Sequence, residues 1–386
     1  MGDSDNTHSS GDADLDQAPV VEREAALRFT GSGAEYFRIW AVNLSLTILS
    51  MGLYGPWAKV RRLQYFYRNT ELDGAVFDYV ASPAAILIGR LLALGLFVLN
   101  YLAFQYSATA GALYTLWLVA VLPFLLWQSS LFRARNTRYR GLSFGFDGGL
   151  GRAYRVYAPP MLVSFSPSVV AAFALGPKAA LWVPILSLLG LLALPFFHAL
   201  FRRYMQSNLR FGDTRFGFSA GTYDFVFIWI VGLIMLAGAG LFGGVVGGAI
   251  AAAVAVNVFK SSHGGDAMGV VIFLLFWFCF LSIGSYFSAC FQKLVWEKTT
   301  VGPVGFRCNL SARRLLWLQF MNTLGMILSL GLYRPFAAIQ LARYRLQTMT
   351  VTGVQHLGDF KLGAGQSRRG ATGESAAELF EMVVGL

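Results

Sequence analysis

The segment Asn69-Thr-Glu-Leu-Asp-Gly-Ala-Val-Phe77 returns later in the chain as Asn136-Thr-Arg-Tyr-Arg-Gly-Leu-Ser-Phe144, with Asn, Thr, Gly and Phe at matching positions. Large residues alternate on both sides of the central glycine, and period-two alternation around such a glycine predicts a β-hairpin. A third copy covers Leu209–Phe218, and weaker relatives cover Thr299–Cys308 and Thr350–Phe360.

These five segments are too short to be stable alone. An isolated two-stranded hairpin is only marginally stable in water, because its edges and one face remain uncovered. Hairpins that leave a membrane on the same face can pair edge to edge. We therefore predict a small cytoplasmic β layer assembled from all five segments. The alternative is five separate loops with transient strand character.

The rest of the chain is too apolar for a soluble protein. Of 386 residues, 56% are hydrophobic and 13% are charged, against about 25% charged in an ordinary soluble domain. Six apolar segments are long enough to cross a hydrocarbon core of about 30 Å. We expect a mainly α integral membrane protein with six transmembrane helices in three consecutive pairs. The pairs are about 84–104 with 111–130, 160–175 with 180–201, and 224–256 with 268–291.

Basic residues are concentrated beside the ends of these apolar segments. Five windows hold 22 of the 31 Lys and Arg residues, whereas the loops within the three pairs hold only Lys178 and Lys260. This asymmetry predicts that the loops within pairs are external and that the basic windows are cytoplasmic. The formal charge of +11 therefore encodes orientation, and we expect no nucleic-acid partner. The windows are 57–68, 131–155, 202–215, 292–314 and 334–345.

The two ends of the chain carry the longest internal repeat. Asn43–Trp57 aligns without gaps to Asn322–Phe336, with 8 of 15 residues identical, which indicates a duplication. Each copy predicts a helix of about 15 residues, a break at Gly-Leu-Tyr-x-Pro, and a second helix that the proline opens. The break motif consists of Asn43, Gly52, Tyr54 and Pro56 in the first copy and Asn322, Gly331, Tyr333 and Pro335 in the second.

Each copy is short for a membrane crossing. Fifteen helical residues rise only about 23 Å, and basic residues lie on both sides of each copy. We therefore expect a re-entrant helical hairpin that enters from the cytoplasm and returns, which leaves both termini cytoplasmic. The alternative is a single tilted crossing.

The motifs of the N-terminal region are long and specific. Phe29-Thr-Gly-Ser-Gly-Ala-Glu-Tyr-Phe-Arg-Ile-Trp40 is followed by Leu49-Ser-Met-Gly-Leu-Tyr-Gly-Pro-Trp-Ala-Lys-Val-Arg61 and by Tyr65-Phe-Tyr-Arg-Asn-Thr70. With Pro83 and Gly89-Arg90, these motifs resemble the YjgN-like family of uncharacterised bacterial inner-membrane proteins. The resemblance runs from about residue 28 to 360, so the acidic tail and the last 25 residues lie outside it. It implies a multi-pass inner-membrane protein and supplies no activity or catalytic residues.

Arginines beside the apolar segments are the candidate ligand-binding residues. Arg90 lies near the start of one segment, either as a buried charge paired with Glu35, Asp73 or Asp78, or as a residue that snorkels to the interface. Other candidates lie in basic clusters among aromatic residues, a composition that binds lipid phosphates and that also determines topology. These candidates are Arg61, Arg62, Arg133, Arg138, Arg202 and Arg203.

One apolar segment contains overlapping G-x-x-x-G spacings. Gly240, Gly244 and Gly248 allow another helix to approach closely. A lipid groove or a hinge is the alternative interpretation.

The sequence contains no pattern that points to catalysis or to a metal. It has no P-loop, G-x-S-x-G, H-E-x-x-H or kinase motif. Its three cysteines and four histidines are scattered, so we expect neither a metal site nor a cofactor.

We therefore expect a non-enzymatic inner-membrane protein that acts as a lipid- or envelope-associated carrier or accessory factor, with membrane lipids as partners. One alternative is a structural protein that docks a cytoplasmic protein partner through the β layer, and another is a small-solute transporter. The expected division is a disordered acidic tail (1–26), a first repeat element with its hairpin (27–80), a six-helix core (81–310), a second repeat element (311–360) and a C-terminal tail (361–386).

Overall fold

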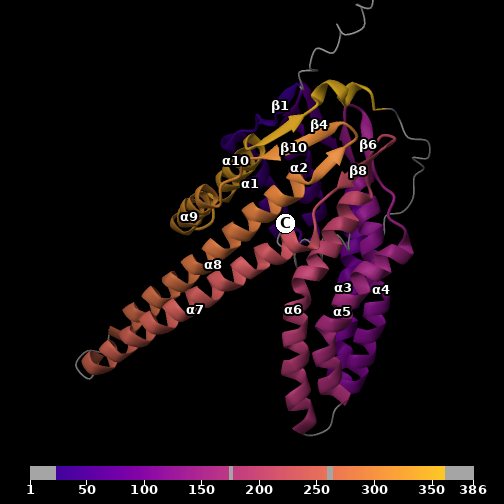
Figure 1. Cartoon of the computed structure of the whole chain (residues 1–386). Coiled ribbons are helices and arrows are strands. Elements are labelled where there is room, and N and C mark those ends of the chain that lie inside the picture. The colour runs from indigo at the N-terminus through magenta and orange to yellow at the C-terminus, as the bar shows by residue number, and fades with distance from the viewer. Residues whose placement is uncertain (1–22, 174–176, 259–263, 361–386) are drawn as a thin grey trace, which may run out of the picture.

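The computed structural model describes residues 23–173, 177–258 and 264–360. Over these residues it contains ten α-helices and eleven short strands (Figure 1). The helices are α1 (Gly33–Leu49), α2 (Gly55–Arg68), α3 (Pro83–Tyr106), α4 (Ala108–Asn136), α5 (Leu150–Phe173), α6 (Pro177–Ser207), α7 (Thr222–Val258), α8 (Gly264–Glu297), α9 (Ala312–Leu328) and α10 (Arg334–Gln347). The strands are β1 (Glu24–Ala26), β2 (Arg28–Phe29), β3 (Thr70–Leu72), β4 (Ala75–Tyr79), β5 (Thr137–Tyr139), β6 (Leu142–Phe146), β7 (Leu209–Phe211), β8 (Thr214–Phe218), β9 (Thr299–Val301), β10 (Val304–Cys308) and β11 (Met349–Thr352).

The strands form one antiparallel sheet that closes on itself. Its order is β1-β11-β10-β9-β8-β7-β6-β5-β4-β3-β2, and only Leu27 separates the two end strands in the chain. The Leu27 N–H itself donates to the Met349 carbonyl at 3.2 Å. One N-terminal segment therefore pairs with β11 through its first half and with β3 through its second half. The result is a β ring in which this segment joins the two ends of the sheet.

The interior of the β ring is filled with aromatic and branched side chains. Phe144 lies opposite Phe211 and Phe216 lies opposite Val301 in adjacent strands, and all four belong to one hydrophobic cluster. The Tyr139 hydroxyl, buried in the same cluster, donates to the Leu72 carbonyl at 2.8 Å. Burial raises the pKa of this phenol, which keeps its proton available for that bond. The ring is therefore a packed core that holds the helices in place.

Local chemistry explains why each helix gives way to a strand at these positions. The Asn69, Asn136 and Asn208 side-chain amides each donate to the carbonyl four residues earlier, at 2.8, 2.9 and 2.7 Å. Each asparagine thereby satisfies a carbonyl of the last helical turn. Gly74 and Gly141 then adopt φ values of 73° and 77°, as a tight type I′ hairpin turn requires.

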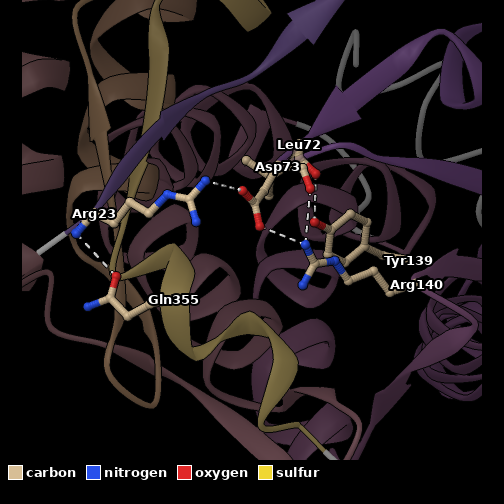
Figure 2. A network of polar contacts seen from close by, with 6 residues as sticks. All are labelled: Arg23, Leu72, Asp73, Tyr139, Arg140 and Gln355. Carbon is tan, nitrogen blue, oxygen red and sulfur yellow. Dashed lines mark hydrogen bonds and ion pairs between the residues drawn. The ribbon is translucent and has the colours of Figure 1, made fainter.

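A polar network fastens the β ring where its closure occurs (Figure 2). Asp73, at the β3–β4 turn, forms an ion pair with Arg23 at 3.5 Å and accepts a hydrogen bond from Arg140 of the β5–β6 turn at 2.7 Å. The Arg23 backbone N–H donates to Gln355 Oε1 at 3.1 Å. Gln355 belongs to the 3₁₀ helix η1 (Val354–Gly358). The network therefore joins the N-terminal segment, two hairpin turns and the segment after β11.

Five helix pairs connect the hairpins, and they extend from the β ring away from its turns (Figure 1). Two pairs are short, α1 with α2 and α9 with α10, and α1 packs against α10. The other three pairs contain six helices long and apolar enough to span a membrane. Helices α3–α6 run side by side, and α7 and α8 run together in a different direction (Figure 1).

The duplicated segments fold alike. In each copy a serine hydroxyl accepts from a tyrosine backbone N–H at 2.9 Å, Ser50 from Tyr54 and Ser329 from Tyr333. In each copy the break glycine has φ of +92°, and the following proline opens the second helix. Asn43 and Asn322 are both buried in the first helix of their copy.

The structure confirms the mainly helical membrane class and the antiparallel sheet. Four of the five predicted hairpins are present. The prediction for Thr350–Phe360 is wrong in its second half, because β1 takes the place of the returning strand and the chain continues as η1. The predicted disordered tail (1–26) extends too far toward the C-terminus, because Glu24–Ala26 form β1. Residues 1–22 lie outside the described residues. The three predicted helix pairs do pack together, but their division into pairs is not confirmed, because α4 packs against α5 as well as against α3.

Ring closure predicts a specific cross-link. Ala26 lies opposite Thr350, and directly opposed residues in antiparallel strands are close enough for a disulfide. Oxidation of the Ala26→Cys, Thr350→Cys variant should form an internal disulfide, detected by mass spectrometry of the linked peptides. The Ala26→Cys, Thr352→Cys variant is the control, because that pair is offset by two residues. Equal cross-linking of both variants would contradict the observed register.

Candidate functional site

The arginines singled out in the sequence are spread over five elements. Arg61 and Arg62 are exposed on α2, and Arg138 is exposed on β5. Arg133 lies near Tyr157. Arg203 donates to the Ala220 carbonyl at 3.1 Å, so it holds α6 against the chain that leads into α7. The structure does not bring these residues together in one site.

Arg90 lies against the first short helix pair. Its guanidinium approaches Gly55, where a Cβ atom would come within 2.2 Å of Nη1. Its proposed counter-ions have other partners: Asp73 pairs with Arg23 and Arg140, Asp78 pairs with Arg68, and Glu35 accepts from the Tyr65 hydroxyl. Arg90 therefore packs against the start of α2, and a side chain at position 55 would displace the end of its guanidinium group.

A large cavity lies between the two groups of long helices, and Arg202 lines it. Its volume is about 970 Å³, at the upper end of the range for small-molecule sites. Most of its wall is apolar and comes from α4, α5, α6 and α8, with single residues from α7 and α10. The apolar wall includes Leu126, Met161, Phe165, Leu194, Phe287 and Phe291.

One end of the cavity is polar, and it is the end nearest the β ring. Arg202 lies near the end of α6, which β7 follows, and its Nε is 3.2 Å from His198 Nε2. On the other side of the imidazole, Trp229 Nε1 is 3.3 Å from His198 Nδ1. A neutral imidazole has one acceptor nitrogen. His198 can therefore accept a hydrogen bond from Arg202 Nε or from Trp229 Nε1, but not from both.

The second charged group at this end is Arg345, four residues before β11 begins. Its Nη2 donates to the Ser288 hydroxyl at 2.6 Å, while its Nε is buried without a hydrogen-bond partner. Burial lowers the pKa of this guanidinium. Gln292 lies one helical turn after Ser288, lines the cavity too, and points its amide at Met349 Sδ, 3.8 Å away.

The two arginines are connected across α8. His198, which contacts Arg202, packs against Phe291 with ring centroids 4.3 Å apart. Phe291 and Ser288, three residues apart, share one face of α8, and Ser288 holds Arg345. Both guanidinium groups therefore line one otherwise apolar cavity, which α8 borders.

Within the described part of the chain, neither guanidinium has a carboxylate partner. Arginine stays protonated in proteins, and the effective cost of moving one ion out of water is several kcal/mol unless an opposite charge compensates. The cavity thus holds two positive charges, unused N–H donors and an apolar wall. This arrangement is suited to an anion that carries a large apolar part.

Sequence reasoning found Arg202 and missed Arg345, Ser288 and Gln292. Arg345 was counted among the orientation-determining bases of its window. Ser285, Ser288 and Gln292 fall at helical spacing on one face of an apolar helix, and that polar stripe was the available signal.

The glycine prediction remains untested. Among the described residues no atom lies within 4 Å of a Cβ placed on Gly240 or Gly244. The side-chain surroundings of Gly248 fall outside the described residues. The close approach that the structure does show in α7 is at Gly232, against the Phe287 ring. In the described ranges no group of three or more His, Cys, Asp or Glu side chains is placed to hold a metal ion.

A family described as "Bacterial protein of unknown function (DUF898)" matches residues 24–379. The chain belongs to this family. The match starts at the first residue of β1 and includes most of the last 25 residues. The family therefore covers more of the chain, at both ends, than the resemblance over about 28–360 indicated. Its first matched residue, Glu24, is also the first residue of the segment that closes the β ring.

Relatives of this DUF898 member carry the name "Inner membrane protein YjgN". The protein from Salmonella typhimurium (strain LT2) is 24% identical over 353 residues, which cover 85% of this chain and 88% of the relative. Those from Escherichia coli O157:H7 and K12 are 27% identical over 207 residues, which cover 49% of this chain and 50% of each relative. No solved structure matches. With the six apolar helices, these similarities place the protein in the bacterial inner membrane, in a family without an established role.

The site predicts an unusual effect on stability. In delipidated detergent solution, Arg345→Met should raise Tm by about 2–4 °C, because removing a half-buried charge without a carboxylate partner is worth about 1 kcal/mol. Arg343→Met is the matched control and should lower Tm, because Arg343 donates to the Gly31 carbonyl at 2.9 Å. A lower Tm for Arg345→Met would make that residue structural.

Proposed function

We propose that this protein binds an anionic membrane lipid, with the headgroup at Arg202 and Arg345 and the acyl part along the apolar wall. The supporting observation is the cavity of about 970 Å³ whose polar end holds two guanidinium groups without a described carboxylate partner. Charge-assisted hydrogen bonds from arginine suit phosphate oxygens. The role is binding and presentation of lipid, not catalysis.

The shape of the cavity supports a lipid over a small solute. The α8 residues that line it run from Gly284 to Trp296, a rise of about 18 Å at 1.5 Å per residue. Apolar residues from α5 and α6 face this stretch. A solute without an apolar part would leave most of that wall uncovered.

We also propose that the β ring faces the cytoplasm. Three of the five basic windows lie at helix ends and strands of the ring, and the other two, 57–68 and 334–345, cover most of α2 and α10, which end at the ring. Positive flanks favour the cytoplasmic side. Lipid headgroups of the inner leaflet would then lie at the level of Arg202 and Arg345.

The two short helix pairs are proposed to enter the bilayer as re-entrant elements. Each pair starts and ends at the β ring, and a helix of 17 residues rises about 26 Å. The tips expose Met51 at 95% and Leu330 at 94%. Apolar tips of this kind are more stable in hydrocarbon than in water.

Lipid binding predicts a difference between two adjacent arginines. Arg202→Gln should weaken binding of phosphatidylglycerol to the purified protein about tenfold, because it removes charge-assisted hydrogen bonds. Arg203→Gln should change binding little, since Arg203 does not line the cavity. Binding is measured by native mass spectrometry in detergent. Equal losses in both variants would indicate a general effect of surface charge and would count against the site.

The proposed orientation predicts the location of both termini. A reporter that is active only in the cytoplasm should give full signal when fused to either end. Both ends are expected on one side because the Val354 N–H donates to the Arg23 carbonyl at 3.2 Å. A periplasmic signal at both ends would reverse the orientation, and opposite signals would contradict the closed ring.

A further inference from the structure

We propose that the lipid at Arg202 and Arg345 carries a terminal phosphomonoester, which is a headgroup with two ionisable oxygens and no organic substituent beyond the phosphate. This inference rests on the lipid-binding function proposed above and names the chemical class of the headgroup. Three independent features of the cavity lead to it.

The first feature is the number of charges. Two guanidinium groups line the polar end, and in the described residues neither has a carboxylate. A phosphomonoester carries a charge of about −1.5 to −2 at pH 7, so one headgroup that contacts both guanidinium groups would neutralise both cations. A phosphodiester or a fatty-acid carboxylate carries a single negative charge, and it would leave one cation uncompensated in an apolar surrounding.

The second feature is the surplus of hydrogen-bond donors. Arg345 Nε has no acceptor, and one of the two N–H groups that flank His198 lacks one as well. The remaining guanidinium N–H groups add further donors on both arginines. A phosphomonoester offers three terminal oxygens, each able to accept more than one hydrogen bond. A phosphodiester offers two.

The third feature is the composition of the cavity wall. Its described lining contains no Asp or Glu, so the ammonium group of a zwitterionic headgroup would have no counter-ion there. An aromatic ring also lies beside one of the two guanidinium groups. The Arg202 Cζ lies 5.9 Å from the Phe201 ring centroid, and Trp296 lines the cavity as well. A bare phosphate fits this surrounding better than a headgroup that needs further polar partners.

The test compares two lipids that differ by one methyl group. The full-length protein in phosphatidylcholine nanodiscs is titrated with dioleoyl phosphatidic acid, a phosphomonoester, and with dioleoyl phosphatidylmethanol, the corresponding methyl phosphodiester. Bound lipid is counted by native mass spectrometry. We expect the phosphomonoester to bind about tenfold more tightly or better, as one additional charge-assisted hydrogen bond predicts.

Protein variants connect this preference to the site. In Arg345→Gln the ratio of the two affinities should fall to about one, because a single guanidinium needs only one negative charge. In Arg343→Gln the ratio should be unchanged, since Arg343 points to the Gly31 carbonyl. If Arg345→Gln does not fold, Arg345→Lys is measured instead. It keeps the charge and should keep a preference for the phosphomonoester.

The possible results distinguish failure of the phosphomonoester assignment from failure of the proposed anionic-lipid binding. Equal affinity for both anionic lipids in the unmodified protein would overturn the headgroup assignment and leave anionic-lipid binding in place. Binding of neither lipid would overturn both. Glycerol 3-phosphate serves as the soluble phosphomonoester and should not displace bound lipid at equal concentration. Displacement at equal concentration would show that the site takes a soluble phosphate compound and would overturn the lipid assignment.

Discussion

The pairing of Glu24–Phe29 with two strands at once is the interaction on which the rest of the structure depends. The first half of this segment pairs with β11 and the second half pairs with β3. Without it, the sheet would have two open edges, and an open edge is a site for pairing with other chains. With it, five hairpin positions form a ring whose turns all face one way. The helix pairs must then leave from the other end, which sets the place of every helix in the molecule.

The cavity follows from this arrangement. Helices α6, α8 and α10 each end a few residues before a strand of the β ring, so their last turns are held close together. Arg202, Gln292 and Arg345 all lie within the last six residues of these helices. Farther from the ring, α6 and α8 belong to helix groups that run in different directions (Figure 1). The ring thus gathers polar groups at one end of a space whose other walls are apolar.

The local parts of this fold could be predicted from the sequence, whereas the long-range strand pairing could not. Asp73-Gly74 and Arg140-Gly141 determine tight turns within a few residues, and so four hairpins could be predicted. The Asn-Thr pair that begins each of the first two motifs donates hydrogen bonds to carbonyls four residues earlier. The pairing of Ala26 with Thr350 could not be predicted from nearby residues, because a strand of three residues can pair with many other strands.

The candidate site was also predictable only in part. Arg202 belongs to the basic pair Arg202-Arg203, which the sequence shows directly. Arg345 could not be recognised as a site residue from the sequence, because its partner Ser288 lies on another helix.

Because β1 pairs with β11 and β2 pairs with β3, the two halves of the N-terminal segment find their partners at different times during synthesis. The β2 half of the N-terminal segment meets its partner Thr70 about 40 residues after Phe29, and contacts this local form early. The β1 half must wait until Thr352, near the end of the chain, has left the ribosome. Until then the growing sheet keeps an unpaired edge at each end, where other chains can pair. The ring therefore closes only after the chain has been made as far as β11, and a chain that stops earlier keeps open edges.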